Sequence, residues 1–116
     1  MSLRILLWGL GAILMGVAGA ARAQAVGPAR QAELINLVRH DCGACHGLTL
    51  KGGLGPALTP QALAGKPEAY LKTIILDGRH GSAMPAWRGL LSEADAAWIA
   101  DQLPKGLPDQ ETANRE

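Results

Sequence analysis

The chain has very few aromatic residues. Its 116 residues include no Phe, and aromatic residues make up only 3% of the total. After residue 23 the only ones are Tyr70, Trp87 and Trp98. A domain of about 90 residues buries a small share of its surface, so it needs large side chains, cross-links or a bound group to be stable. The composition therefore predicts that something other than aromatic side chains fills the core.

Cysteine is also scarce, because the sequence holds only Cys42 and Cys45. A structural zinc site needs a second pair of ligands, which no later cysteine supplies. A thioredoxin-like pair follows a strand in a βαβ unit, whereas the residues around this pair have a helical pattern. Cys42-Gly43-Ala44-Cys45-His46 instead matches the C-x-x-C-H pattern that attaches a c-type haem through two thioethers. His46 would then ligate the iron, and a plain disulfide or redox pair stays the alternative.

A large excess of charge of one sign is missing as well. The formal net charge is +1, and it becomes −1 if Arg4 and Arg22 are removed with an N-terminal leader. Nucleic acids and anionic membrane surfaces attract strongly basic proteins. We therefore expect neither as a partner.

Residues 1–23 have the composition of a cleaved signal peptide. Arg4 precedes an apolar run over residues 5–20, and Ala21-Arg22-Ala23 forms a small-residue cleavage site. We expect cleavage after Ala23, with Ala25 as the alternative position. Glycines interrupt the run, which is short for a span of about 20 residues, so export to the periplasm is favoured over a retained membrane anchor. Export agrees with haem attachment to thiols, which takes place outside the cytoplasm.

The rest of the chain predicts helices and no strands. The expected elements are a helix over residues 28–44, a glycine-rich loop over 47–60, and helices over 67–78 and 92–103. Ser92 is the expected N-cap of the last helix and Pro104 its end, and Trp98 should pack against the first helix near Gly43 or Ala44. The domain would then cover residues 24–104, and residues 105–116 would form a polar, disordered tail.

Two loop residues are candidate partners of the iron site. Met84, which precedes Pro85, is the only methionine after the expected leader. A thioether at this position would serve as the sixth iron ligand, although Met also fills gaps in cores. His80 is the competing ligand, and it would lower the reduction potential; simple solvent exposure is its other interpretation. The carbonyl of Pro56 is a suitable acceptor for the second ring nitrogen of His46.

Together these segments resemble the class I monohaem cytochromes c. The similar residues are Cys42 to His46, Gly55-Pro56, Gly78, Met84-Pro85 and the helix over 92–103. The resemblance implies a small all-α fold of three to four helices around one covalently bound haem c, with the first and last helices crossing. It also implies that His46 and Met84 are the axial ligands of the iron, and that the Pro56 carbonyl accepts a hydrogen bond from His46.

An iron with two protein ligands has no open site for a substrate, so we expect an electron carrier and not an enzyme. The segments GLGPAL and KPEAYLKTIILDGRHGSAMPAW are similar to small periplasmic cytochromes of denitrification operons. That resemblance implies a monomer whose redox partner is a haem-d-type nitrite reductase or a protein that matures its d-type haem. The alternative is a haem protein that reacts with gases or peroxide when Met84 dissociates.

Five cations are candidates for steering a partner toward an exposed haem edge, although each could equally be an ordinary solvated charge. They are Lys51, Lys66, Lys72, Arg79 and Arg88.

Overall fold

The computed structural model describes residues 25–109. Within this range every regular element is helical and no strand is present. The elements are α1 (Pro28–Leu37), the π-helical turn η1 (Val38–Cys42), α2 (Gly43–His46), α3 (Pro60–Leu63), α4 (Glu68–Asp77), α5 (Glu93–Gln102) and the 3-10 turn η2 (Leu103–Lys105). None of the described helices is long and apolar enough to cross a membrane. The expected leader, residues 1–23, lies outside the described residues.

The first helical segment is longer than the sequence predicts and is not uniform. Pro28 occupies its first turn, directly after the N-cap Gly27. Proline suits this position because its missing backbone N–H would have no partner within the helix. The helix then passes through the π turn η1, in which the Gly43 amide donates to the carbonyl of Val38, five residues earlier. The segment ends at Gly47, whose φ of 90° favours glycine. Helical backbone therefore runs through His46 and not only to Ala44.

The caps of the two later long helices follow local rules. Ser92 accepts a hydrogen bond from the Asp95 amide, and the Asp95 carboxylate accepts one from the Ser92 amide, which completes a capping box. Gly78, with φ of 72°, ends α4 as expected. Pro67 is the N-cap of α4 rather than part of its first turn. Pro104 ends α5 but lies inside η2, so helical backbone continues beyond it.

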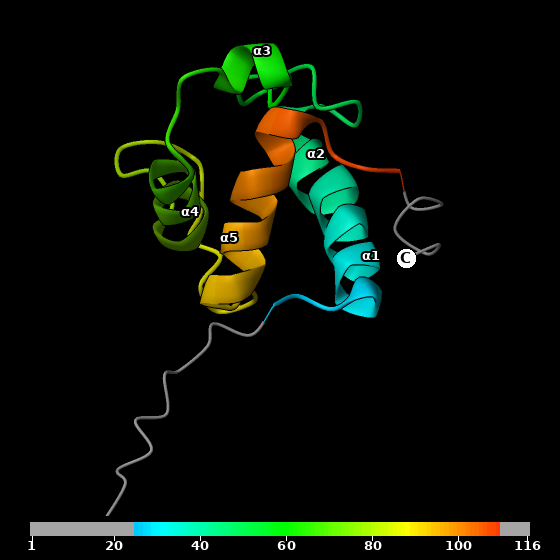
Figure 1. Ribbon diagram of the computed structural model, residues 1–116. Helices are drawn as coiled ribbons and strands as arrows, with labels where there is room; N and C mark the ends of the chain where they lie inside the picture. The colour runs from blue at the N-terminus through cyan, green and yellow to red at the C-terminus, as the bar shows by residue number, and fades with distance from the viewer. Residues whose placement is uncertain (1–24, 110–116) are drawn as a thin grey trace, which may run out of the picture.

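The core lies where α5 packs between α1 and α4 (Figure 1). Aliphatic side chains fill it, and the buried cluster comprises Leu34, Val38, Leu50, Leu63, Leu71, Leu91, Ile99, Ala100 and Leu103. No aromatic side chain in the described range is fully buried; Trp87 and Trp98 are half-buried against the cluster. This agrees with the expectation that aromatic residues contribute little to the core.

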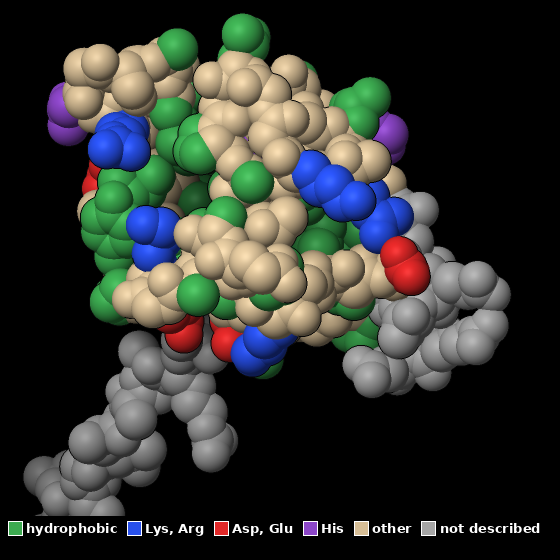
Figure 2. All heavy atoms as spheres, turned by 90° about the horizontal axis from the view of Figure 1, so that it is seen from above, with side chains coloured by type: hydrophobic (Ala, Val, Ile, Leu, Met, Phe, Trp, Pro, Cys, Tyr) green, Lys and Arg blue, Asp and Glu red, His purple; other side chains and the backbone are tan. Residues whose placement is uncertain are grey.

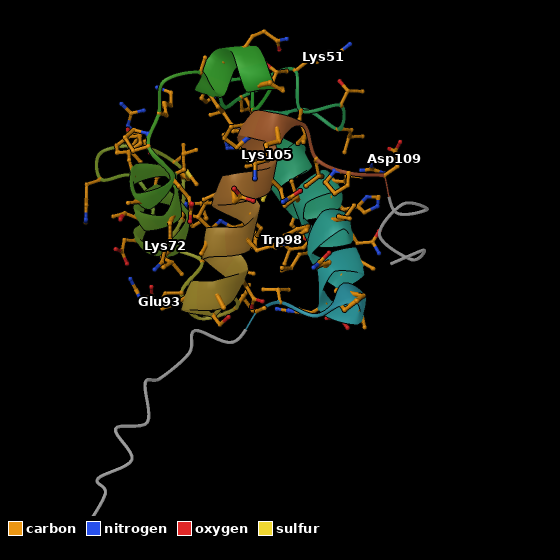
Figure 3. The ribbon with its side chains drawn as sticks, viewed as in Figure 1. Lys51, Lys72, Glu93, Trp98, Lys105 and Asp109 are labelled. Carbon is orange, nitrogen blue, oxygen red and sulfur yellow. The ribbon has the colours of Figure 1, made fainter. Side chains whose placement is uncertain are left out.

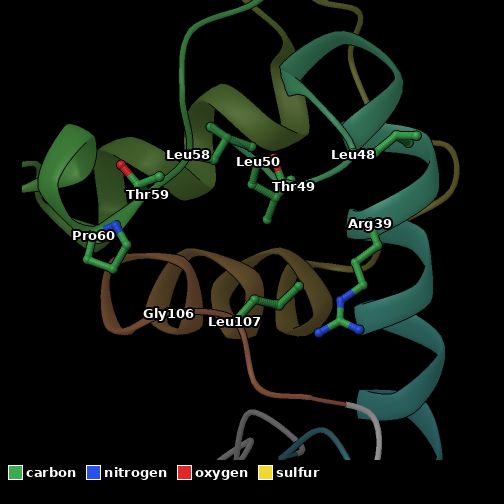
Figure 4. A pocket seen from close by; sticks show the side chains of 9 residues that line it. All are labelled: Arg39, Leu48, Thr49, Leu50, Leu58, Thr59, Pro60, Gly106 and Leu107. Atoms are coloured by element: carbon green, nitrogen blue, oxygen red, sulfur yellow. The ribbon is translucent and has the colours of Figure 1, made fainter. Parts of the chain in front are cut away.

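The first and last helices are joined by an ion pair at their starts. Arg30 donates from Nε and from one terminal nitrogen to the two carboxylate oxygens of Asp95, at 3.2 and 3.0 Å. α1 and α5 run in different directions where they meet (Figure 4), as the predicted crossing requires. Trp98 lies between these two helices (Figure 3). Its packing near Gly43 or Ala44 stays a prediction.

The described part of the expected tail, residues 105–109, contacts the body of the domain. Leu107 packs against the core cluster. Arg39 donates to the carbonyl oxygen of Pro108 at 3.3 Å and pairs with Asp109 at 2.9 Å. The folded part therefore extends past the boundary expected at Pro104, and residues 110–116 lie outside the described range.

Candidate haem site

The two thiols of the C-x-x-C-H pattern lie in one helical turn but in different surroundings. Cys42, at the end of η1, is half-buried and packs against the core cluster, whereas Cys45 in α2 is exposed. Both are free thiols. Burial raises the pKa of Cys42 to about 11, and the nearby Asp41 carboxylate adds to the shift. Cys42 is therefore a neutral thiol at pH 7.

His46 is oriented by the loop that follows it. Its Nδ1 lies 2.7 Å from the carbonyl oxygen of Pro56. A carbonyl only accepts hydrogen bonds, so Nδ1 carries a proton, and in the neutral ring Nε2 then holds the lone pair. This is the ring state that ligates a metal, and the carbonyl contact makes the ring a more basic ligand. The contact that the sequence predicts between Pro56 and His46 is present.

Glycines allow the loop 47–55 to lie directly against this turn. The amides of Gly52 and Gly55 donate to the carbonyls of His46 and Cys45, both at 2.8 Å. A Cβ on Gly53 would lie 2.8 Å from the Cys45 carbonyl oxygen, and a Cβ on Gly55 would lie 2.8 Å from the His46 ring. The sequence predicts that the glycines let the backbone approach the haem closely. In the structure, Gly53 and Gly55 also let the loop lie against Cys45 and the His46 ring, where a larger residue would clash.

Met84 and His80 belong to a different loop, which is attached to the end of α4. Met84 is half-buried, and its carbonyl accepts a hydrogen bond from the Arg79 amide at 3.3 Å. Its own amide donates to the Ser82 hydroxyl at 3.3 Å. A Cβ on Gly78 would lie 2.7 Å from the Met84 carbonyl oxygen, so this loop also needs a glycine. His80 is exposed.

The structure thus brings Cys42, Cys45, His46 and Pro56 into one group and holds Met84 on a separate loop. The donor set fits a covalently bound haem: two free thiols in one turn, and an imidazole whose Nε2 is available. Within residues 25–109, no three His, Cys, Asp or Glu side chains come together as a site for a bare metal ion.

Two of the five candidate steering cations have acidic partners. Lys72 pairs with Glu93, and Arg88 pairs with both Asp77 and Glu93. Lys72, followed by Arg88, holds the pKa of Glu93 below its usual value. These pairs join α4 to the start of α5 and so have a structural role. No sequence signal predicted the pairs, because each depends on how α4, the loop that holds Arg88 and the start of α5 pack together.

A cavity of about 380 Å³ lies outside this group of residues (Figure 4). It is open to solvent between the loops and the C-terminal segment. Its lining residues are Arg39, Leu48, Thr49, Leu50, Leu58, Thr59, Pro60, Gly106 and Leu107. None of the predicted site residues lines it.

Comparisons with known proteins agree with this chemistry. The chain is 58% identical over 77 residues to cytochrome c55X of Pseudomonas aeruginosa, covering 66% of this chain and 65% of that protein. It is 54% identical over 96 residues to cytochrome c55X of Paracoccus denitrificans, covering 83% of this chain and 93% of that protein. It is also 36% identical over 95 residues to the dihydro-heme d1 dehydrogenase of Pseudomonas aeruginosa, covering 82% of this chain and 19% of that enzyme.

A solved structure has the same fold. It is described as c-type cytochrome NirC, and it matches with a TM-score of 0.66 and 56% sequence identity over 67% of this chain and 92% of that one. Residues 29–102 match the family model described as cytochrome C oxidase, cbb3-type, subunit III. The cofactor is therefore a covalently bound haem c. The chain, a small c-type cytochrome that carries electrons and is not an enzyme, belongs to the family of cytochrome c oxidase, cbb3-type, subunit III.

Proposed function

We propose that this cytochrome is a periplasmic electron carrier of a nitrite-reductase system. It donates electrons to a haem-d-type nitrite reductase or takes part in redox maturation of its d-type haem. The observation that carries the proposal is that this chain is similar to one segment of a dihydro-heme d1 dehydrogenase, which makes up 19% of that enzyme. A separate carrier of the same family is suited to exchange electrons with proteins that handle d-type haem.

Each site residue has a distinct part in this proposal. Cys42 and Cys45 would hold the haem through thioethers, and His46 and Met84 would bind its iron. When bound, the haem supplies one-electron transfer between ferric and ferrous iron. The Pro56 carbonyl, 2.7 Å from Nδ1, fixes the tautomer of His46 and strengthens it as a ligand. Met84 would contribute a soft thioether, which would favour ferrous iron and raise the potential.

The periplasmic location rests on the sequence of residues 1–23, which has the order of a cleaved signal peptide. Mass spectrometry of the exported protein should give a chain that begins at Gln24 and carries one haem. A chain that still contains residues 1–23 would contradict this location.

The function is tested by mixing the reduced protein with oxidised haem-d-type nitrite reductase in a stopped-flow spectrometer. We expect rapid oxidation of the cytochrome, with a rate proportional to the reductase concentration. The maturation role is tested in the opposite direction, because a dehydrogenase gives up electrons: the oxidised protein should become reduced when it is mixed with the reduced dihydro-heme d1 dehydrogenase. Failure of the wild-type protein to react with either enzyme would overturn the proposal.

A gas-binding function is the second candidate, because the Met84 loop is weakly held. Both hydrogen bonds at the Met84 backbone are 3.3 Å long, and the residue is only half-buried. Rapid binding of carbon monoxide by the ferrous wild-type protein would favour this second candidate. An unchanged ferrous spectrum under carbon monoxide would favour the carrier.

A further inference from the structure

The loop 47–55 presents apolar side chains to solvent beside the haem site. Leu54 is 95% exposed and Leu48 is 72% exposed. Only two other large hydrophobic residues in the described range are exposed, Tyr70 and Leu90, and both lie outside this loop. A leucine that is almost wholly exposed contributes nothing to the core, although burying it would yield a substantial free energy. The position of Leu54 therefore needs another explanation.

The loop holds Leu54 in place through its backbone. Gly55 donates to Cys45, and Gly53 donates to Gly55 at 3.0 Å, so the residues on both sides of Leu54 are anchored. Gly52 donates to His46. A loop whose backbone is fixed in this way loses little backbone conformational entropy when a partner covers it. The same bonds connect the loop directly to Cys45, which carries the second thiol, and to the next residue, His46.

Lys51 gives the loop a positive charge. Within residues 25–109 it has no acidic partner, as is also true of Lys66 and Arg79, whereas five other cations are paired. Figure 3 shows Lys51 at the α3 end of the molecule, pointing away from the body. Seen from that end, Lys and Arg side chains occur at several places over the face, while Asp and Glu lie at its edges (Figure 2). A partner with carboxylates on its own surface would be complementary.

We propose that the loop 47–55 is the docking surface for the redox partner protein. Leu54 enters an apolar depression on the partner, and Lys51 faces carboxylates at its rim. The proposal rests on the proposed function and names the surface through which it operates. Docking at this loop places the partner next to Cys45 and His46, and electron transfer is fastest over the shortest distance.

The test uses the holoprotein and the stopped-flow reaction with haem-d-type nitrite reductase and with the dihydro-heme d1 dehydrogenase. Leu54→Ser should lower the second-order rate constant about tenfold with the responding enzyme, because one leucine is no longer buried. Leu90→Ser is the matched control, since Leu90 is 71% exposed on another loop, and it should react at the wild-type rate.

Lys51→Glu tests the charge. It should slow the reaction severalfold at low ionic strength, and the difference should fade at high salt, where the Debye length is about 3 Å. Lys66→Glu changes the net charge equally outside the loop and should have a much smaller effect. Equal slowing by the two charge variants would show that net charge and not the loop determines the rate, which would overturn the proposal.

Further outcomes separate the docking surface from the function. Oxidation of each variant by tris(1,10-phenanthroline)cobalt(III), a small reagent that needs no docking surface, should match the wild type, as should the haem content. A Leu54→Ser protein that loses haem or reacts slowly with this reagent would show that Leu54 covers the haem instead. If the wild-type protein reacts and the Leu54→Ser protein reacts at the same rate, the docking surface alone is overturned. No wild-type reaction with either enzyme would overturn the proposed function, and the docking surface with it.

Discussion

Gly55 shows how strongly one position can constrain the site. A Cβ there would lie 2.8 Å from both Cε1 and Nδ1 of His46. Such a contact forces the ring or the loop to move, and the 2.7 Å bond between His46 and Pro56 depends on both. We predict that Gly55→Ala destabilises the holoprotein by about 1–3 kcal/mol, the usual cost of overpacking. Denaturant unfolding followed by the haem absorbance measures it.

Gly89→Ala is the control for Gly55→Ala. A Cβ on Gly89 would have no neighbour within 4 Å, and its φ is not in the left-handed region. This variant should unfold at the wild-type denaturant concentration. Equal stability of the two variants would contradict the steric role that we give to Gly55.

Met84 and His80 can be separated by redox titration. Met84→Ala should lower the potential, because ferrous iron loses a soft ligand, and should open the iron to carbon monoxide. His80→Ala should change neither property, since His80 is exposed. A collapse of the low-spin spectrum in His80→Ala, with little change in Met84→Ala, would mean ligation by two histidines.

Contacts within one loop could be predicted at this scale, and contacts between elements could not. The Pro56 carbonyl lies ten residues after His46 in a glycine-rich loop, so its role follows from local geometry. The pairing of Lys72 with Glu93 depends on how α4 packs on α5. Axial ligation by Met84 stays a prediction, because its loop is separate from the His46 loop.

At the scale of elements, the ion pair between Arg30 and Asp95 joins the starts of α1 and α5. The Arg30 hydrogen bonds, followed by those of Ser92, lower the pKa of Asp95 from 3.8 to about 2, against the opposing effect of burial. A carboxylate whose pKa is lower in the folded state than in the unfolded state stabilises the fold at pH values above the unfolded-state pKa. The stabilisation is therefore complete above about pH 4 and is lost as the pH falls toward 2.

Asp95→Asn should cost about 1–2 kcal/mol of unfolding free energy at pH 7, a figure reduced because the Arg30 side chain is 40% exposed. The difference from the wild type should vanish near pH 2. Glu33→Gln removes the exposed partner of Arg30 and should change stability by less than about 0.5 kcal/mol. A constant Asp95→Asn deficit from pH 7 to pH 2 would contradict the assignment.

The π turn η1 keeps Cys42 on the buried side of the first helical segment. An α-helix turns about 100° per residue, and a π turn about 80°, so the four steps of η1 leave Cys42 about 40° from the direction of Val38. If one residue is removed and the segment becomes a regular α-helix, Cys42 keeps nearly the same direction relative to Val38 and nearly the same rise along the helix axis. We predict that deletion of the exposed His40 preserves covalent haem, whereas insertion of one Ala after His40 abolishes it.

Haem staining of denaturing gels measures both variants. If the deletion variant loses as much haem as the insertion variant, the π turn does not accommodate one residue more than a regular α-helix would.

Helix ends could be read from the sequence better than helix interiors. Ser92 and Gly78 act within a few residues of the chain, so the helix ends at these two residues could be predicted correctly. The π turn has no comparable local signal, because it depends on Val38 and Cys42 both packing against the core. Pro104 ends the α-helix as predicted, but a proline is compatible with the 3-10 turn that follows.

At the scale of the whole molecule, stability depends on what fills a core made of aliphatic side chains. The cluster contains leucines, one valine, one isoleucine and one alanine, with the tryptophans at its margin. Cys42 packs against this cluster, whereas Cys45 is exposed. In the proposed attachment to both thiols, the haem would add its apolar ring to a small core and cross-link it to the first helical segment.

Replacing both thiols should remove this contribution altogether. We predict that the Cys42→Ala/Cys45→Ala protein has no stable haem and no cooperative thermal unfolding transition, as followed by circular dichroism. Met84→Ala is the control, because it removes one proposed ligand and leaves both thioethers, so it should retain haem and unfold cooperatively. The two outcomes together assign the stabilisation to covalent attachment and not to axial ligation. Cooperative unfolding of the double variant near the wild-type temperature would mean that the aliphatic cluster is sufficient by itself.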